Sequence, residues 1–279
     1  MNVKANAKIN LSLDIKGKRA DGYHLIDTVM QSISLCDELT VEKADTITVK
    51  CDKYAIPEEK NIAYKAAKIF FEDYGIKGGA DITIKKNIPA PAGLGGGSAD
   101  AAAVLLALNK LYGAGITDTE LEKTALKLGA DVPFFIKGGC SRAEGIGEVL
   151  TPVKPLSEGC ILLAIAEQKP STGDMYRIID SKPYANCNTE AVITALENNN
   201  LLLLCKNIGN AFTAVWEQSF VKTAMLNLEP LGVSLSGSGP TWFAVFENED
   251  NAKAAKTVLE SQNITCWLTK PQDKAIIFE

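Results

Sequence analysis

The chain begins with an unusually regular alternation of apolar and polar residues. From Val3 to Ile15 every second side chain is apolar, and polar side chains occupy all the positions between them. A period of two is typical of a β-strand that turns one face toward a core. Lys8 and Asn10 share the polar face of this strand. On the pattern alone, Lys8 is more readily interpreted as a solvated lysine on an open sheet face than as a functional group.

The rest of the opening segment predicts further strands and one helix. Three more strands are expected over residues 25–35, 39–41 and 47–51. A helix is expected over 61–70, with Asn61 as its cap and an end near Gly75. A short alternating strand follows over 81–85. The opening of the chain is therefore rich in β-structure.

A glycine-rich stretch connects this last strand to a second helix, which is expected to end at Gly113. It contains glycines at positions 93, 95, 96 and 97. Residues without side chains can turn successive backbone N–H groups toward one point. Ser98 and Ala99 would open the helix, where unpaired N–H groups and the helix dipole favour an anion. The stretch therefore predicts a loop that binds a polyphosphate.

Two better-known glycine loops do not fit this stretch. A P-loop requires a lysine directly before Ser98, and none is present. A dinucleotide-binding loop requires a third glycine in place of Ser98 and an acidic residue at the end of the next strand, whereas the region around Glu120 is helical. A glycine turn kept only for tight packing of a strand against a helix stays open as the alternative.

The middle of the chain contains a helix and a reversal. Thr117 and Glu120 form a capping-box pattern for a helix that stops at Gly129. Asp131 follows in an apolar setting at a chain reversal, where an aspartate commonly does no more than cap the next turn. Proline and polar residues over 150–158 make this segment the best candidate for a linker.

Beyond the linker, the sequence predicts a second α+β unit. It opens with a buried strand over 160–166 and a helix capped by Ser171, and helical patterns continue to Leu228. The remaining expected elements are a glycine-rich loop over 235–240, a strand over 241–246, a helix over 252–261 and strands over 264–268 and 275–278. We therefore expect an α+β protein with domains at residues 1–155 and 156–279.

Composition excludes several classes of protein. The formal net charge is -5, so no basic surface is available for nucleic acid or for acidic membranes. The seven cysteines are widely spaced and the chain has one histidine, which argues against a zinc site and favours reduced thiols. We find no signal region and no apolar run of bilayer length, so we expect a cytoplasmic protein, either a monomer or a homodimer.

Three segments together resemble the motifs of a known family. They are residues 7–11, 89–99 and 234–240. In order and spacing they resemble the three motifs of the GHMP kinases, a superfamily named for galactose, homoserine, mevalonate and phosphomevalonate kinases. The resemblance implies a ribosomal-protein-S5-like N-terminal lobe, a ferredoxin-like C-terminal lobe and an active site in the cleft between them. It also implies that the protein uses ATP with Mg2+.

The resemblance implies catalytic roles for two residues. Asp131 would orient the attacking hydroxyl and accept its proton, while Lys8 would keep Asp131 ionised and offset charge on the moving phosphoryl group. Asn61 and Lys86 would contact the nucleoside of ATP. The phosphates would lie on the loop formed by Pro89, Ala90, Pro91, Ala92, Gly93, Leu94, Gly95, Gly96, Gly97, Ser98 and Ala99. No side chain is assigned to the metal, although Ser98 could be a magnesium ligand.

The run Asp21-Gly22-Tyr23-His24 resembles one branch of the superfamily, which phosphorylates a cytidine diphosphate-linked methylerythritol in isoprenoid precursor synthesis. By this resemblance, the cytosine would be sandwiched by two tyrosines, and its edge would bond to a histidine. The residues implied for the substrate are Asn10, Tyr23, His24, Thr172 and Tyr176. Two alternatives stay open: a kinase for another small alcohol, such as homoserine or mevalonate, and a non-catalytic nucleotide-binding module. The segment 207–212 receives no function.

Overall fold

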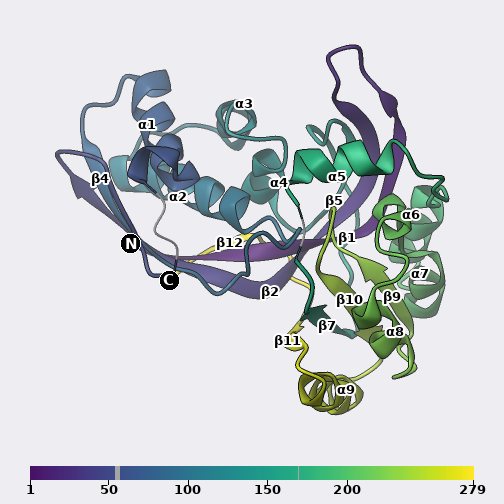
Figure 1. Cartoon of the computed structure of the whole chain (residues 1–279). Coiled ribbons are helices and arrows are strands. Elements are labelled where there is room, and N and C mark those ends of the chain that lie inside the picture. Colours follow the sequence, from purple (N-terminus) through teal and green to yellow (C-terminus); the bar gives the residue numbers. More distant parts are fainter. Residues whose placement is uncertain (54–56, 169) are drawn as a thin grey trace.

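The computed structural model describes residues 1–53, 57–168 and 170–279. Two β-sheets form the centres of two lobes, and helices pack against each sheet (Figure 1). Helices α1 (Ile62–Tyr74) to α4 (Val132–Lys137) lie over one face of the first sheet, and the hairpin between the first two strands extends beside α5 (Thr172–Ile179) (Figure 1). The α+β fold with two lobes agrees with the sequence-based expectation.

The first sheet is built mainly by the N-terminal half of the chain. Its main path runs in the order β12-β1-β2-β4-β3; in addition β8 pairs with β1, β5 pairs with β2, and β6 pairs with β5. Its strands are β1 (Asn2–Lys18), β2 (His24–Ala44), β3 (Thr48–Cys51), β4 (Gly79–Lys85), β5 (Cys140–Gly145), β6 (Val149–Pro152), β8 (Gly209–Asn210) and β12 (Ile276–Phe278).

The long strand β1 contributes to three hydrophobic cores along its length. Val3 and Ala5 pack beneath the helices of the first lobe. Ile9 belongs to a second core that contains residues of both sheets. Leu13 and Ile15 pack into the core of the second lobe. The alternation predicted from the sequence is confirmed, and its apolar side chains connect the two lobes.

Strand β2 joins the predicted strands 25–35 and 39–41 into one. It pairs with β1 on both sides of a register shift, where Ala7 lies opposite Ile33 and the preceding residue of β1 lies opposite Cys36. The residues of β2 between these two partners form a bulge, which absorbs the irregularity without ending the strand. The prediction of two separate strands was therefore wrong.

Several ends of the helices in the first lobe agree with the sequence-based expectation. Asn61 accepts a hydrogen bond from the Ala63 amide at the start of α1, and Gly75 ends that helix in the left-handed conformation. Thr117 and Glu120 form the expected capping box of α3. The helical segments are a 3-10 turn (Glu58–Lys60), α1 (Ile62–Tyr74), α2 (Gly96–Tyr112), α3 (Asp118–Leu126) and α4 (Val132–Lys137).

The second sheet has four antiparallel strands in the order β11-β7-β10-β9. In chain order within this sheet they read 4-1-3-2, which is a ferredoxin-like arrangement. The strands are β7 (Cys160–Ile165), β9 (Gly232–Leu235), β10 (Trp242–Phe246) and β11 (Thr265–Thr269). The helical segments are α5 (Thr172–Ile179), α6 (Thr189–Glu197), α7 (Leu201–Asn207), a 3-10 turn (Ala211–Ala214), α8 (Phe220–Leu226) and α9 (Glu249–Ser261).

The last strand does not belong to the second sheet. β12 pairs with β1, with Val3 opposite Phe278, so the two ends of the chain lie side by side (Figure 1). The prediction that residues 275–278 complete the second α+β unit was wrong. Periodicity identifies a strand but does not identify its partner, and here the free edge of β1 is the partner.

The structure can be compared with two expectations from the sequence: reduced thiols and the absence of a membrane-spanning segment. The seven cysteines are free thiols, and Cys140, Cys160, Cys205 and Cys266 are buried. Among the described residues, no helix is long and apolar enough to cross a membrane.

Candidate active site

A cavity of about 810 Å³ lies between the two lobes and is lined by residues of both. The first lobe contributes the polar face of β1 and the glycine-rich loop before α2. The second lobe contributes the start of α5 and the glycine loop that follows β9. Most of the residues predicted for the site, which lie far apart in the sequence, meet at this cavity.

The glycine-rich loop has the conformation that its sequence requires. Gly93 and Gly95 have φ values of 76° and 73°, in the left-handed region that favours glycine. A β-carbon on Gly93 would lie 2.2 Å from the carbonyl oxygen of Ser236, so the close approach of two loops also requires glycine. Helix α2 starts at Gly96, two residues before the predicted start, and no side chain caps its first turn. Its first N–H groups can therefore bind an anion.

The second glycine loop braces the first one. Ser236 Oγ donates a hydrogen bond to the carbonyl oxygen of Gly93 at 2.9 Å, and Thr241 Oγ1 donates to that of Ala92 at 2.6 Å. These bonds fix the backbone on the entry side of the glycine-rich loop. They explain structurally why the two motifs, about 140 residues apart, occur together.

Asn210 holds the second glycine loop and was missed in the sequence. Its buried amide donates to the carbonyl oxygens of Leu235 and Gly237, at 2.7 and 2.8 Å. Its backbone pairs with Leu13 of β1. The segment 207–212, to which the sequence assigned no function, therefore connects β1 to the loop. The only signal available was the loose likeness of this segment to a motif.

Lys8 is buried rather than solvated, so the simplest interpretation of the sequence was wrong. The residue is 4% exposed, and its Nζ donates to Asn10 Oδ1 at 2.7 Å and lies 3.8 Å from Asp131 Oδ2. Burial lowers the pKa of Lys8, while the charge of Asp131 acts in the opposite direction. The pair therefore places a poorly solvated ammonium group beside a carboxylate at the cavity wall.

Asp131 precedes α4 but does not cap it. Its side chain makes no hydrogen bond to the helix, is 41% exposed and lines the cavity. The apolar setting suggested by the sequence applies to its neighbours, since Val132 and Phe134 are fully buried. The carboxylate itself is directed to the site and is available to a ligand.

Asn10 connects the catalytic candidates to the second lobe. Its Oδ1 accepts from Lys8 and from the backbone N–H of Gly237, the latter at 2.9 Å. Its Nδ2 donates to Thr28 Oγ1 at 2.8 Å. Because both ends of the amide are occupied, the position of Lys8 is fixed relative to both glycine loops.

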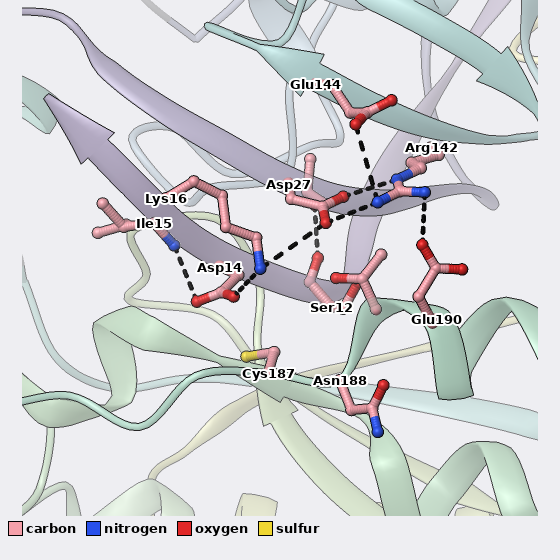
Figure 2. A network of polar contacts seen from close by, with 12 residues as sticks. Ser12, Asp14, Ile15, Lys16, Asp27, Arg142, Glu144, Cys187, Asn188 and Glu190 are labelled. Carbon is pink, nitrogen blue, oxygen red and sulfur yellow. Dashed lines mark hydrogen bonds and ion pairs between the residues drawn. The ribbon is translucent and has the colours of Figure 1, made fainter. Parts of the chain in front are cut away.

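A second register shift in β1 moves the polar residues beyond Asn10 to the opposite face of the sheet. Between Asn10 and Ser12 the pairing with β2 skips one residue, and Leu13 lines the cavity in place of a polar side chain. Asp14 joins a separate polar network instead (Figure 2). The single polar face suggested by strict alternation is therefore divided between two sites.

This network on the opposite face is self-contained (Figure 2). Arg142 donates to both oxygens of Asp27 at 2.9 Å and to Glu190 at 2.8 Å. Lys16 pairs with Asp14 at 2.5 Å and lies 3.9 Å from Asp27. Each buried carboxylate thus has a cationic partner, and the network supports the sheet behind the cavity.

Aromatic rings form the other end of the cavity. Tyr176 stacks on His24, with ring centroids 4.6 Å apart and planes at 23°, and meets Phe212 edge-on. Burial raises the pKa of Tyr176, so its hydroxyl stays protonated. Tyr23 is 61% exposed at the cavity mouth, and Thr172 also lines the cavity. All five residues predicted for the substrate line this one cavity.

Four residues predicted for ATP do not line the cavity. They are Ala90, Ala99, Asn61 and Lys86. The side chain of Asn61 caps α1 instead. Lys86 is buried between two carboxylates and pairs with Asp37 and with Asp100, the latter at 2.6 Å. Its ammonium group is therefore committed to holding the base of the loop rather than presented to a nucleoside.

Family models and relatives agree with this architecture. The model described as "GHMP kinases N terminal domain" matches residues 61–139, and "GHMP kinases C terminal" matches residues 192–265. A 4-diphosphocytidyl-2-C-methyl-D-erythritol kinase of Clostridium novyi is 42% identical, over 96% of this chain and 98% of that protein. One of Acetivibrio thermocellus is 43% identical, over 97% and 98%.

Solved structures give the same picture. A crystal structure of a 4-(cytidine 5′-diphospho)-2C-methyl-D-erythritol kinase superimposes with a TM-score of 0.80 at 35% identity, over 97% of this chain and 99% of that one. A homoserine kinase of Cytophaga hutchinsonii superimposes with a TM-score of 0.78 at 20% identity, over 99% and 96%, and shows the shared fold.

Proposed function

Because the chain belongs to the GHMP kinases, and within them to the 4-diphosphocytidyl-2-C-methyl-D-erythritol kinases, we propose that it phosphorylates that cytidyl compound. The protein is an ATP-dependent kinase of small molecules. The reaction transfers the γ-phosphoryl group of ATP to a hydroxyl of the erythritol unit and gives the 2-phosphate and ADP. The observation that carries the proposal is the Lys8–Asp131 pair, at the wall of a cavity that also holds a glycine loop and an aromatic end.

The chemistry follows from these positions. Asp131 orients the hydroxyl of the acceptor and accepts its proton as the oxygen attacks the γ-phosphorus. Lys8, whose Nζ lies 3.8 Å from Asp131 Oδ2, offsets negative charge on the moving phosphoryl group. The backbone N–H groups of Gly96 and Gly97, at the start of α2, bind the phosphates. Phosphoryl transfer depends mainly on such positioning and electrostatics.

Magnesium completes the donor side. Ser98 lines the cavity and carries a hydroxyl oxygen, the type of ligand that Mg2+ prefers. When bound, the ion would offset negative charge on the phosphates of ATP. Mg2+ usually keeps several water molecules, so one or two protein oxygens suffice.

The acceptor occupies the aromatic end. Tyr23 and Tyr176 enclose the cytosine, and His24 forms a hydrogen bond with the edge of the base. Asn10, through the second hydrogen of its Nδ2, and Thr172 contact the polar remainder of the substrate. The proposal is supported by the position of Tyr176, whose ring lines the cavity and stacks on His24 at this end.

We also propose that the domain boundary lies near residue 155 and that the enzyme works in the cytoplasm. The boundary is supported by the second sheet, which begins with β7 at Cys160, although β12 returns to the first sheet. Seven free cysteines fit a reducing compartment.

The test is an assay of ADP release with ATP, Mg2+ and 4-diphosphocytidyl-2-C-methyl-D-erythritol, beside methylerythritol without the cytidyl group. Turnover only with the cytidyl compound is expected. Equal phosphorylation of a plain small alcohol would refute the assignment of the acceptor.

The proposed base has its own test. Asp131→Asn keeps the shape of the side chain but removes its basicity, and kcat should fall by about 100-fold to 10,000-fold while ATP still binds. Unchanged phosphoryl transfer would show that Asp131 is not the base. Retained binding of ATP in the variant, measured by calorimetry, is the control for correct folding.

A further inference from the structure

Behind the ring of His24 lies a carboxylate that the sequence did not single out. Asp180 directly follows α5 of the second lobe, and its two oxygens bridge two residues of the first lobe. His24 Nε2 lies 2.6 Å from Asp180 Oδ1, and Lys18 Nζ donates to Asp180 Oδ2, also at 2.6 Å. Both Lys18 and His24 line the active-site cavity.

This arrangement determines which nitrogen of His24 carries a proton. Two hydrogen bonds lower the pKa of Asp180, so its carboxyl group stays ionised. The bond from Lys18 contributes most, and the bond from His24 contributes next. An ionised carboxylate can only accept hydrogen bonds. At a separation of 2.6 Å, Nε2 of His24 must therefore be the donor.

The other nitrogen is then free to accept. A neutral imidazole carries one proton, so Nδ1 has a lone pair when Nε2 is protonated. Within the described part of the chain, the contact with Asp180 is the only hydrogen bond that the His24 ring makes. The ring cannot turn easily, because its side chain is 7% exposed and it stacks on Tyr176.

We propose that Asp180 is a positioning residue that holds His24 as the tautomer with an acceptor at Nδ1, and that it thereby selects cytosine over uracil in the acceptor substrate. The proposal rests on the proposed function. Cytosine carries an amino group at C4, which donates, whereas uracil carries a carbonyl oxygen there, which cannot. An acceptor at Nδ1 attracts the amino group of cytosine and repels the carbonyl oxygen of uracil. The donor of uracil, N3–H, lies one atom away and is reached only if the base moves in its stack.

The tautomer can be observed directly, because His24 is the only histidine in the chain. In protein labelled with 15N-histidine, two-bond 1H–15N correlations distinguish the two neutral tautomers from the imidazolium. At pH 8, the native protein should show a protonated Nε2 and an unprotonated Nδ1. In Asp180→Ala, the spectrum should shift toward a mixture of forms. A native spectrum with a proton on Nδ1 would overturn the proposal.

Selectivity provides the second readout. We compare kcat/KM for 4-diphosphocytidyl-2-C-methyl-D-erythritol with that for its uridine analogue. Loss of one fixed hydrogen bond should reduce the preference for cytosine by about 10-fold to 100-fold in Asp180→Ala. A general loss of activity with an unchanged ratio would overturn the proposed role, because a merely structural defect affects both substrates alike.

The matched control is Asp174→Ala. Asp174 lies in α5, the helix that Asp180 follows, and it bonds to Ser171 and Arg177 and not to His24. Its removal should leave both the spectrum of His24 and the selectivity ratio as in the native protein. If neither pyrimidine compound is phosphorylated by the native enzyme, the proposed function fails, and the NMR result alone decides whether Asp180 sets the tautomer.

Discussion

Gly93→Ala tests the contact between the two glycine loops. Gly93 has φ of 76°, and an added β-carbon would lie 2.2 Å from the carbonyl oxygen of Ser236 and 3.1 Å from that of Gly239. Neither backbone atom can give way as the end of a flexible side chain could. The loops must separate, and the hydrogen bonds from Ser236 Oγ and Thr241 Oγ1 would be lost or weakened.

The expected loss can be worked from these parts. A left-handed conformation costs an alanine about 1 kcal/mol, and each of the two hydrogen bonds contributes about 1 kcal/mol. If both hydrogen bonds are lost, the free energy of unfolding should therefore fall by about 3 kcal/mol. The KM for ATP should rise as well, because the entry of the phosphate loop loses its support.

The matched control is Gly97→Ala. Gly97 is helical, and its added β-carbon would have its nearest contact at 3.6 Å, with Ile62. Replacing a helical glycine by alanine should leave stability unchanged or raise it by up to about 1 kcal/mol. Urea unfolding of both variants makes the comparison of stability, and ATP kinetics of Gly93→Ala are compared with those of the native protein. A Gly93→Ala protein with native stability and native KM for ATP would refute the reasoning.

Further predictions concern the charged groups. Lys8→Met should lower kcat by about 1,000-fold or more without loss of stability at pH 7. Burial lowers the pKa of Lys8, so the unfolded chain binds this proton more tightly than the native protein does. The stability of the native protein therefore rises with pH between the lowered pKa and 10.5. The same shift predicts that kcat falls on the alkaline side below pH 10.5, as the ammonium group deprotonates; a flat pH profile would contradict this. Arg142→Met should destabilise the protein by up to about 3 kcal/mol, because the buried carboxylate of Asp27 loses both of its hydrogen bonds to the guanidinium group and, among the described residues, keeps only the ammonium group of Lys16, 3.9 Å away. Adding Asp27→Asn should recover part of that loss in urea unfolding, and no recovery would contradict the pairing (Figure 2).

Local signals in the sequence specified the elements well. Caps such as Asn61 and the Thr117–Glu120 box involve residues within three or four positions of one another, so pattern and structure agree. The left-handed glycines of the phosphate loop follow the same rule, because their conformation is a property of the residue itself.

Local patterns did not predict which distant segments of the chain pair with one another. Alternation predicted β1 but not its register shifts, which decide that Asn10 faces the active site and Asp14 the opposite side. The strand at 275–278 was identified without its partner. Lys86 was assigned to ATP by resemblance, whereas its burial beside Asp100 depends on contacts between separate elements. Asp180 was missed because its contact with His24 forms only where the end of α5 lies against the first hairpin.

The course of β1 through three cores has a consequence for how the molecule comes apart. The same strand carries Val3 under the first lobe and Ile15 in the second, and the end of the chain returns to its edge through β12. Neither lobe can lose its sheet without removing a strand from the core of the other. Heat or urea should therefore melt both lobes in a single cooperative step, despite the size of the chain. The cleft between the lobes is built on a continuous backbone rather than on a flexible joint.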